Sequence, residues 1–356
     1  MNKIRVLIID DSALIRKMLT EILNSSPDIE VIGTAADPLI AREMIKQLNP
    51  DVLTLDIEMP NMDGITFLRN LMRLRPTPVV MISTLTEKGA GVTLEALTLG
   101  AVDFIAKPKV DVVNALNNYA EEIISKVKMA ARANIGNSFN RTLKTREADK
   151  IPKDVNLKTE AVKKRPVASN KIIALGASTG GTEAIKVVAK GLPADTPAIV
   201  ITQHLPAAFS ESFVRHIDLV TEMTACIPKH GQLVEAGHIY LAPGDRHMEV
   251  VREGSRYVIK LLDTEPVNRH KPAVDVMFRS VAQCAGANAI AVLLTGMGAD
   301  GAMGMKEMHD AGAKTVIQDE QSSVVWGMPG AAFKLGCTDH VLPLDEIAGR
   351  ILALVH

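Results

Sequence analysis

The chain has 356 residues, of which 47% are hydrophobic and 23% are charged, and its formal net charge is −1. This length predicts about two domains, and the near-balanced charge excludes a whole-chain basic or acidic surface for nucleic acid or a membrane. The three cysteines lie far apart and match neither a disulfide framework nor a metal-ligand spacing, and no apolar run is long enough to cross a membrane, so we expect a cytoplasmic protein without membrane insertion.

The N-terminal part of the chain alternates between short β-rich runs and stretches with helical spacing. The β-rich runs are residues 4–9, 31–35, 52–56, 79–83 and 103–106. Strands that alternate with helices in this way favour one parallel sheet with helices on both of its faces. We therefore predict an α/β domain in this part of the chain.

Polar residues stand at the ends of these predicted strands. Asp10 and Asp11 follow the first strand, Asp56 ends the third, Ser83 ends the fourth and Lys107 follows the fifth. In a parallel sheet all of these side chains face one crevice, because the carboxyl ends of the strands share an edge. Hard oxygen ligands suit Mg²⁺, which would neutralise a phosphoryl group on Asp56 while Lys107 pairs with its oxygens. Helix capping explains one or two of these residues, but it explains the whole set poorly.

Four motifs in this region resemble the receiver domains of two-component response regulators. They are DD at 10–11, LDIEMPNMDG at 55–64, IST at 82–84 and KP at 107–108. The resemblance implies a flavodoxin-like receiver fold over residues 1–122, with Asp56 as the phosphoacceptor. It also implies Mg²⁺ as the cofactor of phosphorylation, with a chemotaxis histidine kinase as the phosphodonor. The implied metal ligands are Asp10, Asp11, Asp56 and the backbone carbonyl of Glu58, and the implied switch residues are Ser83, Phe104 and Lys107. Phe104 lacks the hydroxyl that the family often carries at that position.

Residues 123–168 are predicted to form a helical extension followed by a polar linker. Residues 135–169 lose apolar periodicity and hold nine Lys or Arg against four Asp or Glu. Such a basic excess could contact an acidic partner, but it is more often a solvated segment, which is the interpretation that we favour.

Three apolar runs in the C-terminal half end in residues that could act together in catalysis. The run that begins at Lys171 leads to Ser178, the run at 198–203 ends at His204, and the run at 289–295 leads to Asp300. If the runs are buried parallel strands, the three side chains lie on one rim. An imidazole can then take the proton of the hydroxyl, while the carboxylate fixes the tautomer of the imidazole. Backbone amides of the glycine-rich loop, at Met297 or its neighbours, could stabilise an oxyanion.

Each of these residues also has a simpler interpretation when it is taken alone. Ser178 could cap a helix, His204 could be a structural histidine and Asp300 could be an N-cap; their joint placement favours a triad. The sequence G-A-S-T-G around Ser178 is not the G-x-S-x-G elbow, and the glycines do not spell G-x-G-x-x-G, so neither an α/β-hydrolase nor a dinucleotide-binding domain is predicted. His247 and His270 are interpreted as residues of surface loops.

Five motifs in this half resemble the catalytic domain of chemotaxis protein-glutamate methylesterases. They are GASTGG at 176–181, TQHLP at 202–206, APGDRHM at 242–248, HKPAVDVMFRS at 270–280 and LLTGMGADG at 293–301. The resemblance covers residues 169–356 and implies a doubly wound, mainly parallel α/β domain with added short strands. It further implies Ser178 as nucleophile, His204 as base and Asp300 as its partner, with Thr179 beside the nucleophile and Met297 at the oxyanion site. No cofactor is expected in this domain.

The implied activity is a phosphorylation-activated hydrolase of sensory adaptation. Its substrates would be methylglutamate side chains of methyl-accepting chemotaxis receptors, and it would also convert certain receptor glutamines to glutamate. Two other classes stay open, namely a response regulator whose output domain only binds a partner and one that binds DNA. DNA binding is disfavoured because the output half shows no helix-turn-helix with a basic recognition helix.

Overall fold

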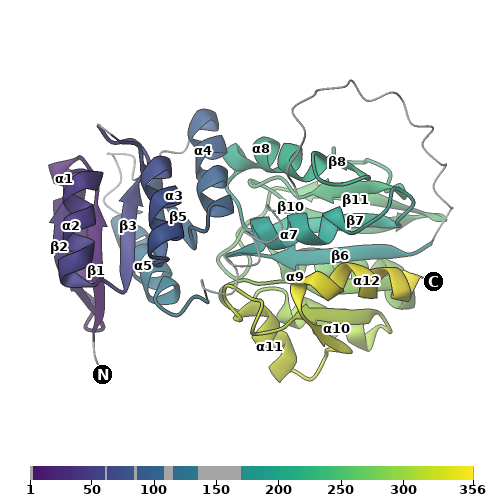
Figure 1. Ribbon diagram of the computed structural model, residues 1–356. Helices are drawn as coiled ribbons and strands as arrows, with labels where there is room; N and C mark the ends of the chain where they lie inside the picture. Colours follow the sequence, from purple (N-terminus) through teal and green to yellow (C-terminus); the bar gives the residue numbers. More distant parts are fainter. Residues whose placement is uncertain (1–2, 61, 84–85, 108–114, 135–169, 356) are drawn as a thin grey trace. The chain divides into compact units, whose positions relative to one another are not determined.

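The computed structural model describes residues 3–60, 62–83, 86–107, 115–134 and 170–355. The chain divides into two compact units, Met1–Phe139 and Asn140–His356, drawn in purple to blue and in teal to yellow in Figure 1. The domain boundaries at residues 122 and 168 stay predictions, and the linker predicted at 135–169 lies outside the described residues.

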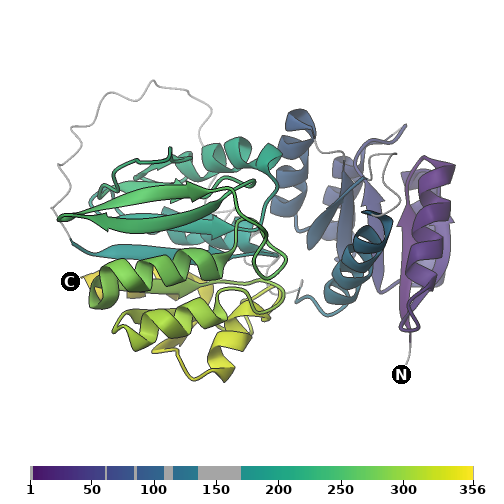
Figure 2. The same cartoon turned by 180° about the vertical axis from the view of Figure 1, so that it is seen from behind.

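The first unit is a five-stranded sheet in the order β2-β1-β3-β4-β5, in which every neighbouring pair is parallel. The strands are β1 (Ile4–Ile9), β2 (Ile29–Ala35), β3 (Val52–Asp56), β4 (Val79–Ser83) and β5 (Asp103–Ala106). The helices are α1 (Ala13–Asn24), α2 (Pro38–Leu48), α3 (Gly64–Leu74), α4 (Glu87–Thr98) and α5 (Ala115–Ala130). Helix α1 packs beside α5, and α3 packs beside α4, so helices cover both faces of the sheet (Figures 1 and 2). The predicted receiver fold is confirmed.

Side chains at the ends of loops start most of these helices. Ser12, Asp37, Asp63 and Thr86 each accept a hydrogen bond from a backbone N–H of the first turn that follows. Such caps satisfy donors that have no partner inside the helix. Because each capping residue stands shortly after a strand, the turn from strand to helix is fixed at the carboxyl edge of the sheet.

The second unit is built on a seven-stranded sheet in the order β14-β13-β12-β6-β7-β9-β8, again with every pair parallel. The strands are β6 (Ile172–Ala177), β7 (Ala198–Gln203), β8 (Thr224–Cys226), β9 (His238–Leu241), β12 (Ala289–Leu293), β13 (Lys314–Gln318) and β14 (His340–Leu342). A separate antiparallel pair consists of β10 (His247–Glu253) and β11 (Arg256–Leu262). The predicted mainly parallel domain with added short strands is confirmed.

Helices flank this sheet on both sides. They are α7 (Gly181–Lys190), α8 (Ala207–Asp218), α9 (Val274–Ala285), α10 (Ala302–Asp310), α11 (Met328–Lys334) and α12 (Leu344–Val355), with a short 3₁₀ turn η1 (Gly286–Asn288) after α9. Helix α9 packs against both β6 and β10, and its Val274, Met277 and Phe278 are fully buried. A Cβ at Gly176 would lie 2.3 Å from Cγ1 of Val274, so glycine lets the start of α9 approach β6 closely.

The three strands at the centre of this sheet carry the predicted catalytic side chains at their ends. Strands β12, β6 and β7 are neighbours, and each is buried along its whole length. Strand β12 ends at Leu293 rather than at the predicted residue 295, which leaves residues 294–301 as a loop before α10. None of the helices in the described part of the chain is long and apolar enough to cross a membrane.

Candidate functional site

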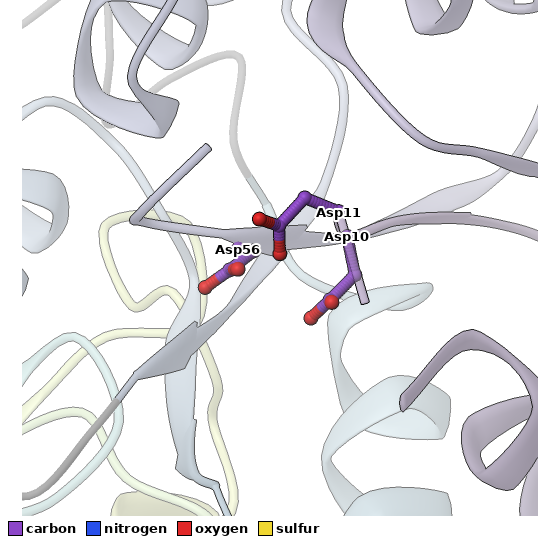
Figure 3. Close-up of side chains that lie close together, drawn as sticks. All are labelled: Asp10, Asp11 and Asp56. Atoms are coloured by element: carbon purple, nitrogen blue, oxygen red, sulfur yellow. The ribbon is translucent and has the colours of Figure 1, made fainter. Parts of the chain in front are cut away.

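Three carboxylates meet at the carboxyl edge of the first sheet. Asp10 and Asp11 follow β1 and Asp56 ends β3, and one ligand oxygen from each lies within 4.8 Å of the others (Figure 3). Lys107, just after β5, places its Nζ 2.7 Å from Oδ2 of Asp56 and 3.4 Å from Oδ2 of Asp10. Strands β1 and β3 are neighbours and β5 lies beyond β4 in the same parallel sheet, so the sheet brings the predicted carboxylates and lysine to one edge.

This cluster holds more negative charge than Lys107 can balance. Burial raises the pKa of Asp56 to about 6, because the hydrogen bond from Lys107 only partly offsets desolvation and the charge of Asp10. Burial also raises the pKa of Asp10, whose Oδ2 is buried without a hydrogen bond of good geometry. An orphaned carboxylate oxygen beside two further carboxylates is a donor set that fits a hard divalent cation such as Mg²⁺.

The remaining predicted receiver residues differ in their surroundings. A cleft of about 980 Å³ is lined by Asp11, Asp56, Glu58 and Ser83 among others. The Oγ of Ser83 lies 2.7 Å from Oγ1 of Thr93, so this hydroxyl already shares a hydrogen bond with α4. Phe104 is buried in β5 and packs under Nζ of Lys126, which lies 5.0 Å from the ring centroid.

In the second unit, Ser178 stands in a tight turn between β6 and α7. Its N–H donates to the carbonyl oxygen of Thr295, and its own carbonyl oxygen accepts from Gly181 N–H and from Nε2 of Gln203. Gly180 has a φ of +76°, and a Cβ there would meet the side chain of Val324 at 2.6 Å. The turn therefore requires glycine at position 180. Hydrogen bonds to both the N–H and the carbonyl oxygen of Ser178 hold its backbone in place.

Ser178, His204 and Asp300 form one chain of hydrogen-bonded side chains. Nδ1 of His204 lies 3.1 Å from Oγ of Ser178, and Nε2 of His204 lies 2.8 Å from Oδ2 of Asp300. The ionised carboxylate can only accept, so the proton of the neutral ring is on Nε2 and Nδ1 is left to accept from the hydroxyl. The three residues follow the neighbouring strands β6, β7 and β12 and lie on one rim, as the sequence predicted. Nδ1 of His204 therefore faces the hydroxyl of Ser178.

Asp300 is held as an anion by several donors. Its Oδ2 accepts from Val274 N–H at 2.7 Å, and its Oδ1 accepts from Nδ2 of Asn268 at 2.8 Å and from Asp275 N–H at 3.2 Å. Burial by itself would raise the pKa of Asp300, but these donors and His204 lower it to about 2. The carboxylate therefore stays charged at every pH at which the protein would act.

The two residues predicted beside the nucleophile lie next to it in the structure. Thr179 is buried and its carbonyl oxygen accepts from Oγ1 of Thr295. Met297 follows Gly296, where a Cβ would stand 2.8 Å from Cβ of Ser178. The loop before α10 therefore touches the nucleophile at Gly296, which brings the backbone of Met297 close to it.

The interpretation of His247 and His270 as surface-loop residues is wrong. His247 is fully buried at the start of β10, where its Nδ1 accepts from Ala273 N–H and its Nε2 donates to the carbonyl oxygen of Glu265. His270 is half-buried and stacks on His204, with ring centroids 3.7 Å apart. Asn268 and Asp275 were not predicted as site residues. His247, His270 and Asp275 lie inside the motifs APGDRHM and HKPAVDVMFRS, but no local pattern shows which residues they contact, because most of their partners come from distant segments.

Comparisons with known proteins agree with this geometry. A family model described as CheB methylesterase matches residues 173–351, and one described as response regulator receiver domain matches residues 6–117. The chain is 57% identical to protein-glutamate methylesterase/protein-glutamine glutaminase 1 of Xanthomonas campestris pv. campestris over 99% of this chain and 97% of the relative. It is 55% identical to the protein-glutamate methylesterase/protein-glutamine glutaminase of Hydrogenovibrio crunogenus, with both chains covered completely.

A solved structure gives the same result for the second unit. The catalytic domain of Thermotoga maritima CheB methylesterase matches with a TM-score of 0.51 and 33% identity, over 53% of this chain and 100% of that one. The chain therefore belongs to the CheB methylesterase family and carries a response regulator receiver domain ahead of its methylesterase domain.

Proposed function

We propose that the second unit hydrolyses γ-glutamyl methyl esters of chemoreceptors through an acyl-enzyme on Ser178. The observation that carries this proposal is the hydrogen-bonded chain from Oγ of Ser178 through His204 to Asp300. The members of the family named above are protein-glutamate methylesterases, and this chain matches them along its whole length. The overall reaction consumes one water and yields a glutamate carboxylate, methanol and a proton.

The mechanism follows from the positions of the ring nitrogens. Nδ1 of His204 takes the proton of the Ser178 hydroxyl as Oγ attacks the ester carbonyl, and Asp300 stabilises the imidazolium that results. Backbone amides at Thr179 and Met297 would stabilise the oxyanion. The proton on Nδ1 then passes to the departing methoxide, and methanol leaves. Water, activated by the same nitrogen, attacks the acyl-enzyme and regenerates Ser178.

The same site would also deamidate certain receptor glutamines. Ester and amide both pass through an oxyanion and an acyl-enzyme, so no further group is required. Ammonia is a poorer leaving group than methanol and needs the proton of His204 before the C–N bond breaks. We therefore expect deamidation to be the slower of the two reactions.

The first unit is proposed to control this activity through phosphorylation of Asp56 by a chemotaxis histidine kinase. Asp10, Asp11, Asp56 and the backbone carbonyl of Glu58 would hold Mg²⁺, which when bound neutralises charge on the phosphoryl group. Lys107 already contacts Asp56 and would pair with a phosphoryl oxygen. Ser83 would give up its hydrogen bond with Thr93 and form one to another phosphoryl oxygen. Phosphorylation would then shift a two-state equilibrium that limits the esterase.

The experiment that tests the proposal uses the full chain and receptor membranes that carry radiolabelled methyl groups. Release of labelled methanol should rise when acetyl phosphate and Mg²⁺ are added. Ser178→Ala should abolish release while it still becomes phosphorylated, and Asp56→Asn should keep a basal rate that does not respond to acetyl phosphate. Substantial methanol release by Ser178→Ala would remove the nucleophile assignment, and a response of Asp56→Asn would remove the phosphoacceptor assignment.

A further inference from the structure

A two-residue turn contacts both the proposed base and its carboxylate. Asn268 and Arg269 have positive φ values of 54° and 68°. They are flanked by Val267 and His270, which exchange both backbone hydrogen bonds, at 3.0 and 2.9 Å. Successive positive φ values are the signature of a tight hairpin turn, and they cost free energy in residues other than glycine. We therefore expect that contacts of the side chains on this turn offset that free-energy cost.

Asn268 joins two buried carboxylates through one amide group. Its Nδ2 donates to Oδ1 of Asp300 at 2.8 Å and to Oδ2 of Asp275 at 2.7 Å. The amide has two N–H groups, so both hydrogen bonds can form at once. Asp275 is 5% exposed, and Gly304 N–H donates to its other oxygen. The amide thus separates two carboxylates that would repel each other, and it holds Asp300 with Oδ2 turned to His204.

His270 covers one face of the proposed base. Its ring lies nearly parallel to that of His204, with an angle of 9° between planes and 3.7 Å between centroids. A stacked ring leaves both nitrogens of His204 accessible in its plane, where Ser178 and Asp300 lie. It also restricts rotation of the imidazole about its bond to Cβ. The contact therefore favours the one ring orientation that joins nucleophile and carboxylate.

We propose that the turn Val267–His270 is a positioning element for the catalytic group, in which Asn268 orients the carboxylate of Asp300 and His270 fixes the plane of the His204 ring. This inference rests on the proposed function, in which His204 is the base. Neither side chain takes part in making or breaking a covalent bond. Their contribution is to keep the proton path aligned, so their loss should lower kcat and leave KM nearly unchanged.

Paired variants of the full chain separate the contacts from the fold of the turn. Asn268→Gly keeps positive φ accessible but removes the amide, and it should lower kcat about 10-fold or more. Asn268→Asp adds a third carboxylate, which favours the protonated form of His204 and should move the acid limb of the kcat/KM profile to higher pH. His270→Ala should lower kcat about 10-fold, whereas His270→Phe keeps a stacked ring and should restore kcat to within about 3-fold of the parent.

Two further measurements make the outcomes distinct. A fluorophosphonate that phosphonylates Ser178 with loss of fluoride reports the alignment of Ser178 and His204 without any receptor, so its rate should fall in parallel with kcat. His309→Ala, at the far end of α10, is the matched control for loss of a histidine and should match the parent in both assays.

Parent-like kcat, pH profile and phosphonylation rate in both Asn268→Gly and His270→Ala would overturn the inference. An equal loss in His270→Phe and His270→Ala would overturn the role of stacking. Reduced activity that follows reduced thermal stability, with an unshifted pH profile in Asn268→Asp, would show a merely structural turn. Ester hydrolysis by Ser178→Ala would instead refute the proposed function itself, which keeps the two failures separate.

Discussion

Each unit has a buried aspartate at the carboxyl edge of its sheet, and the pKa values of the two carboxyl groups are shifted in opposite directions. Asp56 is the last residue of β3, and Asp300 lies in the loop that joins β12 to α10; both β3 and β12 are inner strands of a parallel sheet. The pKa of Asp56 is raised to about 6, because burial and the charge of Asp10 outweigh Lys107. The pKa of Asp300 is lowered to about 2, because His204, Asn268 and Val274 donate to it and outweigh burial. A position at the carboxyl edge of a sheet therefore does not decide whether a carboxylate is ionised. The hydrogen-bond donors and charges around it do.

This difference suits the two proposed roles. A phosphoacceptor must meet an incoming phosphoryl group and a cation, so a carboxylate with unsatisfied neighbours is left ready for both. The carboxylate of a triad must stay charged and immobile while its imidazole gains and loses a proton.

The largest effect is expected when the charge of Asp300 is removed. Asp300→Asn should lower kcat/KM for ester hydrolysis about 10³–10⁴-fold, because the amide cannot stabilise the imidazolium and favours the wrong tautomer of His204. Phosphorylation of Asp56 should proceed as in the parent. Steady-state methanol release and phosphoprotein formation from acetyl phosphate measure the two properties, and a loss below 10-fold would show that Asp300 does not serve the base.

A smaller effect is expected from Gly296→Ala in the loop before α10. The added Cβ would lie 2.3 Å from Sδ of Met328, whose flexible side chain can move, and 2.8 Å from Cβ and 3.1 Å from N of Ser178, which cannot move without disturbing the turn between β6 and α7. We expect kcat to fall about 10- to 100-fold. Gly349→Ala in α12 is a matched control, because no atom lies within 4 Å of a Cβ at that position and the residue lies inside a helix. Equal rates for the two variants would show that contact with Ser178 does not matter.

The smallest effect concerns the free energy of unfolding of the first unit and depends on the protonation of Asp56. The pKa of Asp56 is about 6 in the folded unit, whereas in the unfolded chain the carboxyl group has its ordinary pKa of 3.8. Stability therefore falls as pH rises through that window, and Asp56→Asn should avoid the loss. The variant should be more stable than the parent by about 1–2 kcal/mol at neutral pH, with the difference shrinking toward pH 4.

Calorimetry of the full chain without divalent cations measures this difference. The receiver transition of the parent and of Asp56→Asn should be compared at about pH 4 and at about pH 7.5. Added Mg²⁺ should then stabilise the parent more than the variant, because the variant offers one charged ligand fewer. A stability difference that is the same at both pH values would contradict the raised pKa of Asp56.

Much of the molecule could be predicted from the order of residues along the chain. Alternating β-rich and helical runs predicted the parallel sheet of the first unit, and apolar runs together with the family resemblance predicted that of the second. Residues placed just after strands predicted which side chains would meet. Asp10, Asp56 and Lys107 gather in the first unit, and Ser178, His204 and Asp300 gather in the second. This works because a strand's carboxyl end is a local property, and parallel pairing then brings those ends to one edge.

Other features could not be predicted in this way. The order β12-β6-β7, the use of Nδ1 toward Ser178, and the burial of His247 all depend on contacts between distant segments. Asn268 and His270 sit among polar residues in a stretch typical of a surface turn, and only their contacts with Asp300 and His204 reveal another role. His270 opens the motif HKPAVDVMFRS and Asn268 stands just before it, but a motif does not show which distant residue each side chain contacts.

The sequence by itself determined the parallel sheet of the first unit and the side chains that follow its strands, because hydrophobic periodicity and turn residues act over short stretches of chain. For the second unit, the apolar runs and the family resemblance together predicted a mainly parallel sheet. Tertiary structure decided how those side chains ionise and which way they face. Desolvation, neighbouring charge and hydrogen-bond donors come from segments such as the start of α9 and the turn at 267–270, which approach Asp300 only in the folded chain. The acidity of a buried carboxylate is therefore a property of the fold and not of its motif.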